Sequence, residues 1–184
     1  EFLSGQSAEL TEPFRPGHTY DLRVSHPTLG EVSARQTMPG PVAVTQAEFD
    51  PDGGIDEFGD EVSELVVRFS DPAGEENYYE LGVIFVFNGT NTKRISATED
   101  QLFGKTTWNN FITFDDRTFD GKDQTFTFRF YGDYLEPEQT EVFLIWRSIS
   151  RERYLYLNSL TAQLWNEDNP FAEPVSVFSN LEGG

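Results

Sequence analysis

The chain has 184 residues, 13 of them basic and 32 acidic, so its formal net charge at pH 7 is −19. That charge repels phosphate backbones, which excludes nucleic acid as an expected partner. There is no cysteine, and this excludes disulfides, thiolate metal sites and cysteine catalysis. The 17 Phe, 7 Tyr and 3 Trp favour a β-rich fold with few helices, because aromatic side chains suit half-buried pleated surfaces.

The first readable elements are two strands that form a hairpin. Apolar and polar residues alternate over 19–25 and again over 31–35, which is the strand period. Two strands cannot bury their own apolar face, so the hairpin completes a sheet whose other strands are missing or docks on the rest of the chain. The first alternative is preferred, and residues 1–40 are then the end of an upstream region. The opening residues are typical of a loop inside a longer protein, so we expect a leader and an anchor before them.

A strand is predicted over 42–49, and an acidic loop, DPDGGIDEFGDE, comes after it. Closely spaced carboxylates around glycines can wrap calcium, which prefers several oxygen ligands. The spacing differs from that of the helix-loop-helix calcium loop, and a solvated acidic turn is the competing interpretation. The candidate calcium ligands are Asp50, Asp52, Asp56 and Asp60.

The centre of the chain is the stretch FSDPAGEENYYELGVIFVF at 69–87. Two alternating runs, 62–70 and 78–87, flank the polar turn DPAGEEN, which is typical of a hairpin or of a corner between strands. Exposed turn residues can bind ligands, although Asp71 can equally cap the turn and Asn77 can bond local backbone. The candidate ligand-binding residues are Asp71, Glu75, Glu76, Asn77 and Tyr78.

The last third of the chain contains a second acidic loop, two strands and a helix. The loop FDDRTFDGKDQ carries Asp115, Asp116, Asp120 and Asp123, and turn chemistry is again the competing interpretation. Alternation predicts strands over 125–131 and 142–149, paired with each other. At Ser150, a good N-cap, the apolar period changes from two to nearly four, which predicts a helix over about 151–166. The Pro-containing tail is predicted to be extended, at a sheet edge or across the surface.

These elements predict a mainly β protein. The expected fold is an immunoglobulin-like antiparallel β-sandwich with one late α-helix, over residues 41–184.

Several segments, in the same order, resemble one known family. They are TYDLRVS with ARQTMPGPV, FSDPAGEENYYEL, FDDRTFDGKDQTFTFRF, ISRERYLYLNSL and NPFAEPVSVFSNLEGG, and they resemble the Bacteroidetes lipoproteins called domain of unknown function four-two-four-nine. The resemblance implies an outer-membrane-anchored lipoprotein of the cell envelope, held by a lipidated cysteine that this sequence does not contain. It also implies an upstream immunoglobulin-like region, of which residues 1–40 would be the last hairpin, and frequent association with receptors that depend on the protein TonB. The family has no established catalytic residues to carry over.

Three alternative functions are consistent with these observations. The first is a non-enzymatic binding or accessory component of an outer-membrane receptor system, with the membrane reached only through the lipid anchor and no cofactor needed. The second is an adhesin or carbohydrate-binding module stabilised by calcium. The third is a glycoside hydrolase with a carboxylate pair from Asp71, Glu75 and Glu76, or from Asp115 and Asp116. No catalytic residue is assigned, and two histidines are too few for a histidine triad or a zinc site.

Overall fold

A computed structural model of the chain describes residues 13–56, 58–87, 89, 91–95, 105–107, 109–131, 140–167 and 171–183. These residues form mainly β structure with one helix late in the chain, as the alternation along the sequence predicted. The elements are β1 (Thr19–His26), β2 (Gly30–Thr37), β3 (Val44–Ile55), β4 (Glu61–Ser70), β5 (Tyr78–Phe87), β6 (Asn91–Ile95), β7 (Lys105–Thr106), β8 (Ile112–Asp115), β9 (Asp123–Tyr131), β10 (Thr140–Ile149), α1 (Arg151–Asn166) and β11 (Glu182–Gly183).

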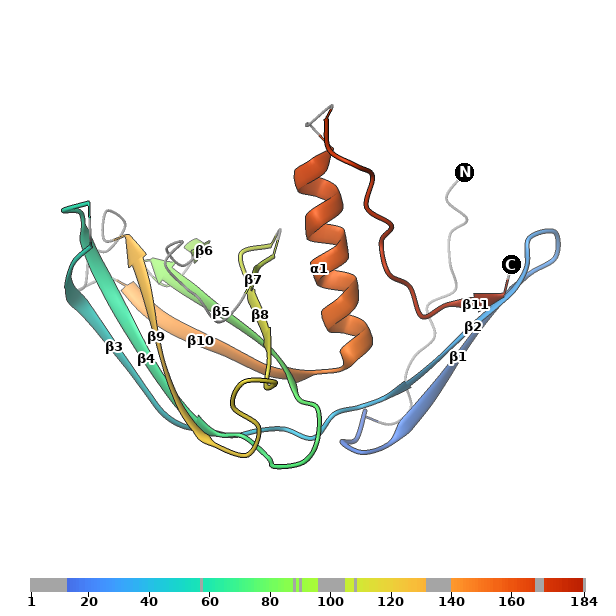
Figure 1. Cartoon of the computed structure of the whole chain (residues 1–184), viewed down its shortest axis with the longest axis horizontal. Coiled ribbons are helices and arrows are strands. Elements are labelled where there is room, and N and C mark those ends of the chain that lie inside the picture. Colours follow the sequence, from blue (N-terminus) through green and yellow to red (C-terminus); the bar gives the residue numbers. More distant parts are fainter. Residues whose placement is uncertain are drawn as a thin grey trace.

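Two antiparallel sheets form the sandwich (Figure 1). One has the order β3-β4-β9, and the other has the order β10-β5-β8-β7 with β6 also paired to β5. The turn at 71–77 is therefore a corner that carries the chain from β4 in one sheet to β5 in the other. The predicted pairing of the strands at 125–131 and 142–149 is wrong, because β9 pairs with β4 and β10 pairs with β5.

Aromatic rings fill the space between the two sheets. Phe69 of β4 lies 5.3 Å from Tyr79 of β5, and Phe85 of β5 lies 6.2 Å from Phe130 of β9, between ring centroids. Such pairs contribute about 0.5–1.5 kcal/mol each beyond the burial of their area. The alternation that defined β5 therefore places one of its faces in the core, with Tyr79, Leu81, Val83 and Phe85 at most 2% exposed.

The helix α1 begins where its N-cap predicts and covers the outer face of the second sheet. The Ser150 hydroxyl accepts a hydrogen bond from the Arg153 amide at 3.2 Å, which satisfies one of the free amides of the first turn. Leu157 and Thr161 are buried, and Asn158 donates to the Thr113 hydroxyl of β8 at 3.2 Å. In the part of the chain that the structure describes, no helix is long and apolar enough to cross a membrane.

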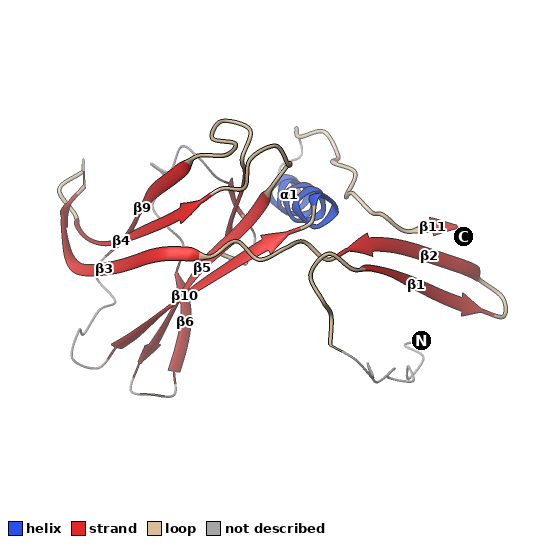
Figure 2. Cartoon of the chain, turned by 90° about the horizontal axis from the view of Figure 1, so that it is seen from below, coloured by secondary structure: helices blue, strands red, loops and turns tan. Residues whose placement is uncertain are grey.

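The N-terminal hairpin does not stand alone, because the end of the chain pairs with it. β11 adds to β2 with the register Glu182 to Ser33 and Gly183 to Val32, so a separate sheet has the order β1-β2-β11. Figure 2 shows this sheet beside the sandwich. The origin of the hairpin in an upstream region stays a prediction, and the pairing with the tail is a feature that the sequence did not reveal.

Candidate functional site

Two of the segments singled out in the sequence, the turn at 71–77 and the loop at 115–123, lie against each other. The Asp116 carboxylate accepts from the amide and the side chain of Asn77, at 2.8 and 3.2 Å. The Asp120 carboxylate accepts from the Gly74 amide at 2.8 Å. Side chains of the loop at 115–123 therefore hold the corner between the two sheets in place.

Asp71 is the buried centre of this contact, with 6% of its surface exposed. It accepts hydrogen bonds from the Tyr79 hydroxyl and from the Gly121 amide, the latter at 2.9 Å. Burial raises the pKa of the Tyr79 hydroxyl, and the Asp71 carboxylate beside it raises that pKa further. Asn77 bonds the backbone of the turn itself, since its side chain donates to the carbonyls of Pro72 and Glu75. Asp71 joins the corner to β5 and to the loop at 115–123 and does not cap its own turn.

Asp71, Asp116 and Asp120 offer ligand oxygens within 4.8 Å of one another, and no other trio of potential metal ligands in the described residues does so. Burial raises the pKa of the Asp116 carboxyl and the charge of Asp71 adds to this, although the bonds from Asn77 oppose it. Four of the six carboxylate oxygens already accept hydrogen bonds. Calcium prefers six to eight oxygen ligands, so this cluster is arranged as a hydrogen-bonded corner.

The four residues predicted as calcium ligands lie elsewhere and do not form such a cluster. Asp50 and Asp52 belong to β3 itself, so the predicted loop begins later than expected. The Asp50 carboxylate accepts from the Asp52 amide, and the Asp56 carboxylate accepts from the amides of Phe58 and Asp60, all at 2.9 Å. The bonds at Asp56 are those of an acidic turn, whereas the bond between Asp50 and Asp52 lies within β3.

The remaining predicted binding residues lie on the surface. Glu75 and Glu76 are exposed, and Tyr78 donates to Glu76 at 2.9 Å. The Tyr78 ring lies 5.0 Å from that of Tyr154, whose hydroxyl donates to Asp115 at 3.2 Å. Burial alone would raise the pKa of Asp115, but its hydrogen bonds and charge contact with Arg117 lower it overall.

The carboxylates suggested for hydrolysis are divided between the buried corner and the surface. Asp116 is 3% exposed and Asp71 is 6% exposed, and both accept hydrogen bonds from the corner described above. A glycosidase needs two carboxyl groups that flank the bond to be cleaved.

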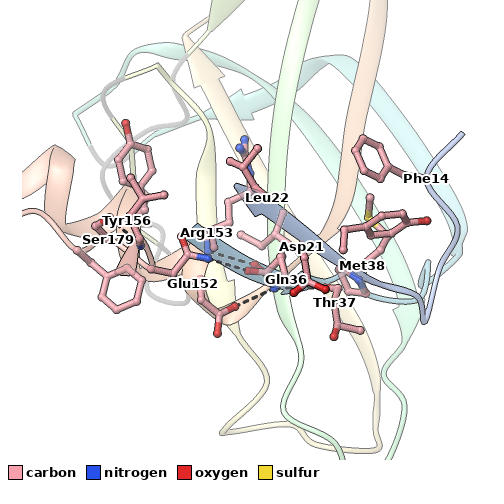
Figure 3. Close-up of a pocket in the computed structure, with 18 of the residues that line it drawn as sticks. Phe14, Asp21, Leu22, Gln36, Thr37, Met38, Glu152, Arg153, Tyr156 and Ser179 are labelled. Carbon is pink, nitrogen blue, oxygen red and sulfur yellow. Dashed lines mark hydrogen bonds between the residues drawn. The ribbon is translucent and has the colours of Figure 1, made fainter. Parts of the chain in front are cut away.

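A second site, which the sequence did not indicate, is a groove between the β1-β2 hairpin, the start of α1 and the tail (Figure 3). Its volume is about 1120 Å³. Exposed apolar side chains from separate segments line it: Phe14, Leu22, Tyr156, Val177 and Leu181. Figure 3 shows Leu22 of the hairpin and Tyr156 of the helix on different walls. We call it the hairpin-helix groove.

Charged residues gather where β10 runs into α1, at one wall of this groove. Glu80 of β5 is completely buried, and it accepts hydrogen bonds from Arg147 at 3.0 Å and from Arg153 at 3.0 and 3.1 Å. Glu152 accepts from the Gln36 side chain at 3.0 Å, which joins helix and hairpin across the groove. Burial alone would raise the pKa of Glu152, but hydrogen bonds from its own amide and from Gln36 lower it overall.

Comparison with protein families decides what this chain belongs to. The model of the family described as Domain of unknown function (DUF4249) matches residues 3–184. The chain belongs to the DUF4249 family. Searches of curated proteins and of solved structures found no match.

The groove of this DUF4249 chain was missed because it joins segments that are far apart in the sequence. One local signal pointed to it: Leu22 and Val24 give the hairpin an apolar face, and both side chains are more than half exposed. A second apolar segment, VSVF at 175–178, lies after the helix and supplies Val177 to the opposite wall. Each signal is typical of an ordinary strand or tail when taken alone.

Proposed function

We propose that this chain is a non-enzymatic binding component of the cell envelope, which takes up a largely apolar ligand in the hairpin-helix groove. It would act as an accessory to an outer-membrane receptor that depends on TonB. The envelope setting and the receptor rest on the lipoprotein resemblance of the sequence segments. The binding role rests on the groove.

The observation that carries the proposal is the concentration of exposed apolar side chains. Thirteen large apolar residues are exposed among those that the structure describes, and five of them line this one groove. Single exposed apolar residues are normal on a protein surface, whereas a contiguous patch marks a binding site. The groove volume of about 1120 Å³ is slightly above the range of roughly 300–1,000 Å³ that ligand sites occupy.

Binding of a neutral apolar dye, N-phenyl-1-naphthylamine, tests the groove directly. We expect saturable enhancement of its fluorescence with the unmodified chain. Leu22→Asp with Tyr156→Asp should abolish the enhancement, because each substitution places a charge on an apolar wall. Leu29→Asp is the matched control, since Leu29 is 74% exposed at the hairpin turn and lies outside the groove. Equal enhancement in all three proteins would contradict a binding role for the groove.

Association with a receptor needs its own experiment. The full-length lipoprotein, tagged and extracted from envelope with a mild detergent, should recover an outer-membrane receptor in stoichiometric amount by mass spectrometry. Recovery of the lipoprotein alone would contradict the proposed accessory role, and the protein would then be a binding protein that acts without the receptor. The dye experiment remains decisive for the groove in either case.

A further inference from the structure

Two arginines, Arg147 and Arg153, give one wall of the hairpin-helix groove an excess of positive charge over the buried Glu80. One buried carboxylate faces two guanidinium groups, since Arg147 and Arg153 both form ion pairs with it at 3.0 Å. Glu80 has no exposed surface, whereas each arginine side chain is 46% exposed. The cluster therefore carries a net charge of about +1, and its exposed part is cationic.

The arginines keep hydrogen-bond donors for another group. Arg153 contacts Glu80 only through Nη2, and Arg147 only through Nη1. Their other side-chain nitrogens make no hydrogen bond to the residues that the structure places. A guanidinium has five N–H donors in a planar fork, which matches the two oxygens of a carboxylate. Arg147 is also held over the Phe111 ring at 5.2 Å, so its position is fixed before anything binds.

Negative groups nearby limit what these donors can accept. Glu152 lines the same groove and is already bonded to Gln36. Asp21, another lining residue, lies 3.6 Å from Arg35. A polyanion would meet these carboxylates as well as the arginines, whereas one carboxylate can bond to the arginines alone.

From this geometry we infer that the ligand is an amphipathic monocarboxylic acid, with its carboxylate on Arg153 and Arg147 and its apolar body along Leu22, Tyr156 and Val177. The inference rests on the proposed binding function and gives the ligand its chemical class. The chain as a whole carries a charge of −19, which disfavours unspecific adsorption of an anion. Saturable binding of such an acid would therefore report a local cationic site.

A comparison of head groups on the unmodified chain tests the inference without any folding risk. Dodecanoate and dodecyltrimethylammonium would be titrated by calorimetry below their micellar concentrations, and methyl dodecanoate below its solubility limit. We expect dodecanoate to bind one to one and at least tenfold more tightly than the methyl ester, because only the acid has a charged acceptor for both arginines. The ammonium compound should show no saturable binding in the groove.

Variants then assign the head group to its residues. Arg153→Lys keeps a cation beside Glu80 but loses the planar guanidinium. The affinity for dodecanoate should therefore fall several-fold, while the affinity for the methyl ester stays the same. Leu22→Asp should lower the affinity for both ligands, and Leu29→Asp should lower neither affinity.

Equal affinity of the acid and the ester would overturn the inference and leave the proposed binding function intact, provided that the neutral dye still binds. Absence of binding by dodecanoate and by the dye would overturn both. Light scattering is the last check, because a dimer that buries Leu22 and Tyr156 would make a second copy of the chain the occupant and would also overturn the inference.

Discussion

Arg153 at the start of α1 donates through one nitrogen to both carboxylate oxygens of Glu80 on β5, at 3.0 and 3.1 Å. This contact ties the helix to the outer face of the sheet, and Arg147 of β10 reinforces it from the neighbouring strand. The carboxylate is fully buried while both cations reach the surface. One ion cluster thus fixes the helix and also supplies the charged wall of the groove.

The first prediction concerns the charge balance of this cluster. Replacing both arginines with methionine should cost about 3–5 kcal/mol in the free energy of unfolding, since it leaves a buried carboxylate without a counter-ion. Glu80→Gln should cost less, because the two arginines are partly hydrated already. Adding Glu80→Gln to the double variant should recover much of its stability. Urea unfolding of the four proteins measures this, and a double variant within about 1 kcal/mol of the parent would show that Glu80 does not need its cations.

The second prediction concerns the close approach of Phe111 to β5. A Cβ atom at Gly82 would lie 2.1 Å from the Phe111 ring, so Gly82→Ala should overpack the outer face and destabilise the protein by about 1–3 kcal/mol. Gly40→Ala is the control, because nothing lies within 4 Å of its Cβ position. Thermal melts of both variants are sufficient, and equal melting temperatures would contradict the packing described.

The third prediction concerns pH. The pKa of Asp116 is raised in the folded protein, so its stabilising contribution is fully present below the unfolded pKa and is lost as pH rises through the folded value. Ionised Asp116 is therefore a cost at pH 7, and urea unfolding at that pH should show Asp116→Asn to be more stable than the parent. The gain should shrink as the pH falls and vanish well below the ordinary Asp pKa of about 3.9, where Asp116 is protonated in both states.

Asp115→Asn should change the stability at pH 7 in the opposite direction, and it serves as the control for Asp116→Asn. The pKa of Asp115 is lowered in the fold, so its contribution is present above the unfolded pKa and is lost as pH falls through the folded value. This variant should be less stable than the parent at pH 7, and the difference should shrink in acid. If both variants changed the stability in the same direction with pH, the opposite pKa shifts of Asp115 and Asp116 would be contradicted.

The sequence predicted the elements whose causes are local. Ser150 and the apolar spacing after it mark α1, and alternation marks β4, β5 and β9. The prediction was wrong at Asp50 and Asp52, because the two glycines after them suggested a turn. In the structure β3 continues through all four residues with a shift in register. Gly53 is needed there since its Cβ would lie 2.6 Å from Glu64 of β4.

The pairing of the strands and the geometry of the candidate sites depend on long-range contacts, which a single sequence does not specify. β9 and β10 alternate equally well, so nothing local decides which of them lies beside β5. The prediction that Asn77 bonds local backbone is confirmed by its bonds to the carbonyls of Pro72 and Glu75. Asp71 was predicted to cap the same turn, but it accepts from Tyr79 and from Gly121 of the loop at 115–123 instead. The groove needed the helix, the hairpin and the tail to be brought together, and only the fold does that.

The fourth prediction concerns calcium. Because most carboxylate oxygens at Asp71, Asp116 and Asp120 already accept hydrogen bonds, we expect several millimolar calcium to leave the melting temperature unchanged relative to chelator. A rise would contradict this, and two variants would locate the ion. Loss of the rise in Asp116→Asn would place it at the corner, whereas loss in Asp52→Asn would place it in the acidic loop predicted from the sequence.

The fifth prediction concerns the tail that closes the groove. Gly183 has φ +101°, and its Cβ would lie 2.4 Å from the Glu31 carbonyl oxygen, so Gly183→Ala should detach β11 from β2. Successive residues of β2 turn their backbone groups to opposite neighbours, β1 and β11. Amide exchange should therefore accelerate at least tenfold at the one of Val32 and Ser33 whose N–H faces β11. Ligand binding in the groove should weaken as well, since Leu181 lies just before β11 and lines the groove.

Gly30→Ala separates this effect from backbone strain. Gly30 also has a positive φ, +89°, but nothing lies within 4 Å of its Cβ position. Its substitution therefore costs conformational strain in the hairpin turn without a clash against the tail. If Gly30→Ala accelerates exchange at that amide as much as Gly183→Ala does, strain in the hairpin would explain the change, and the contact with the tail would not be what protects this amide.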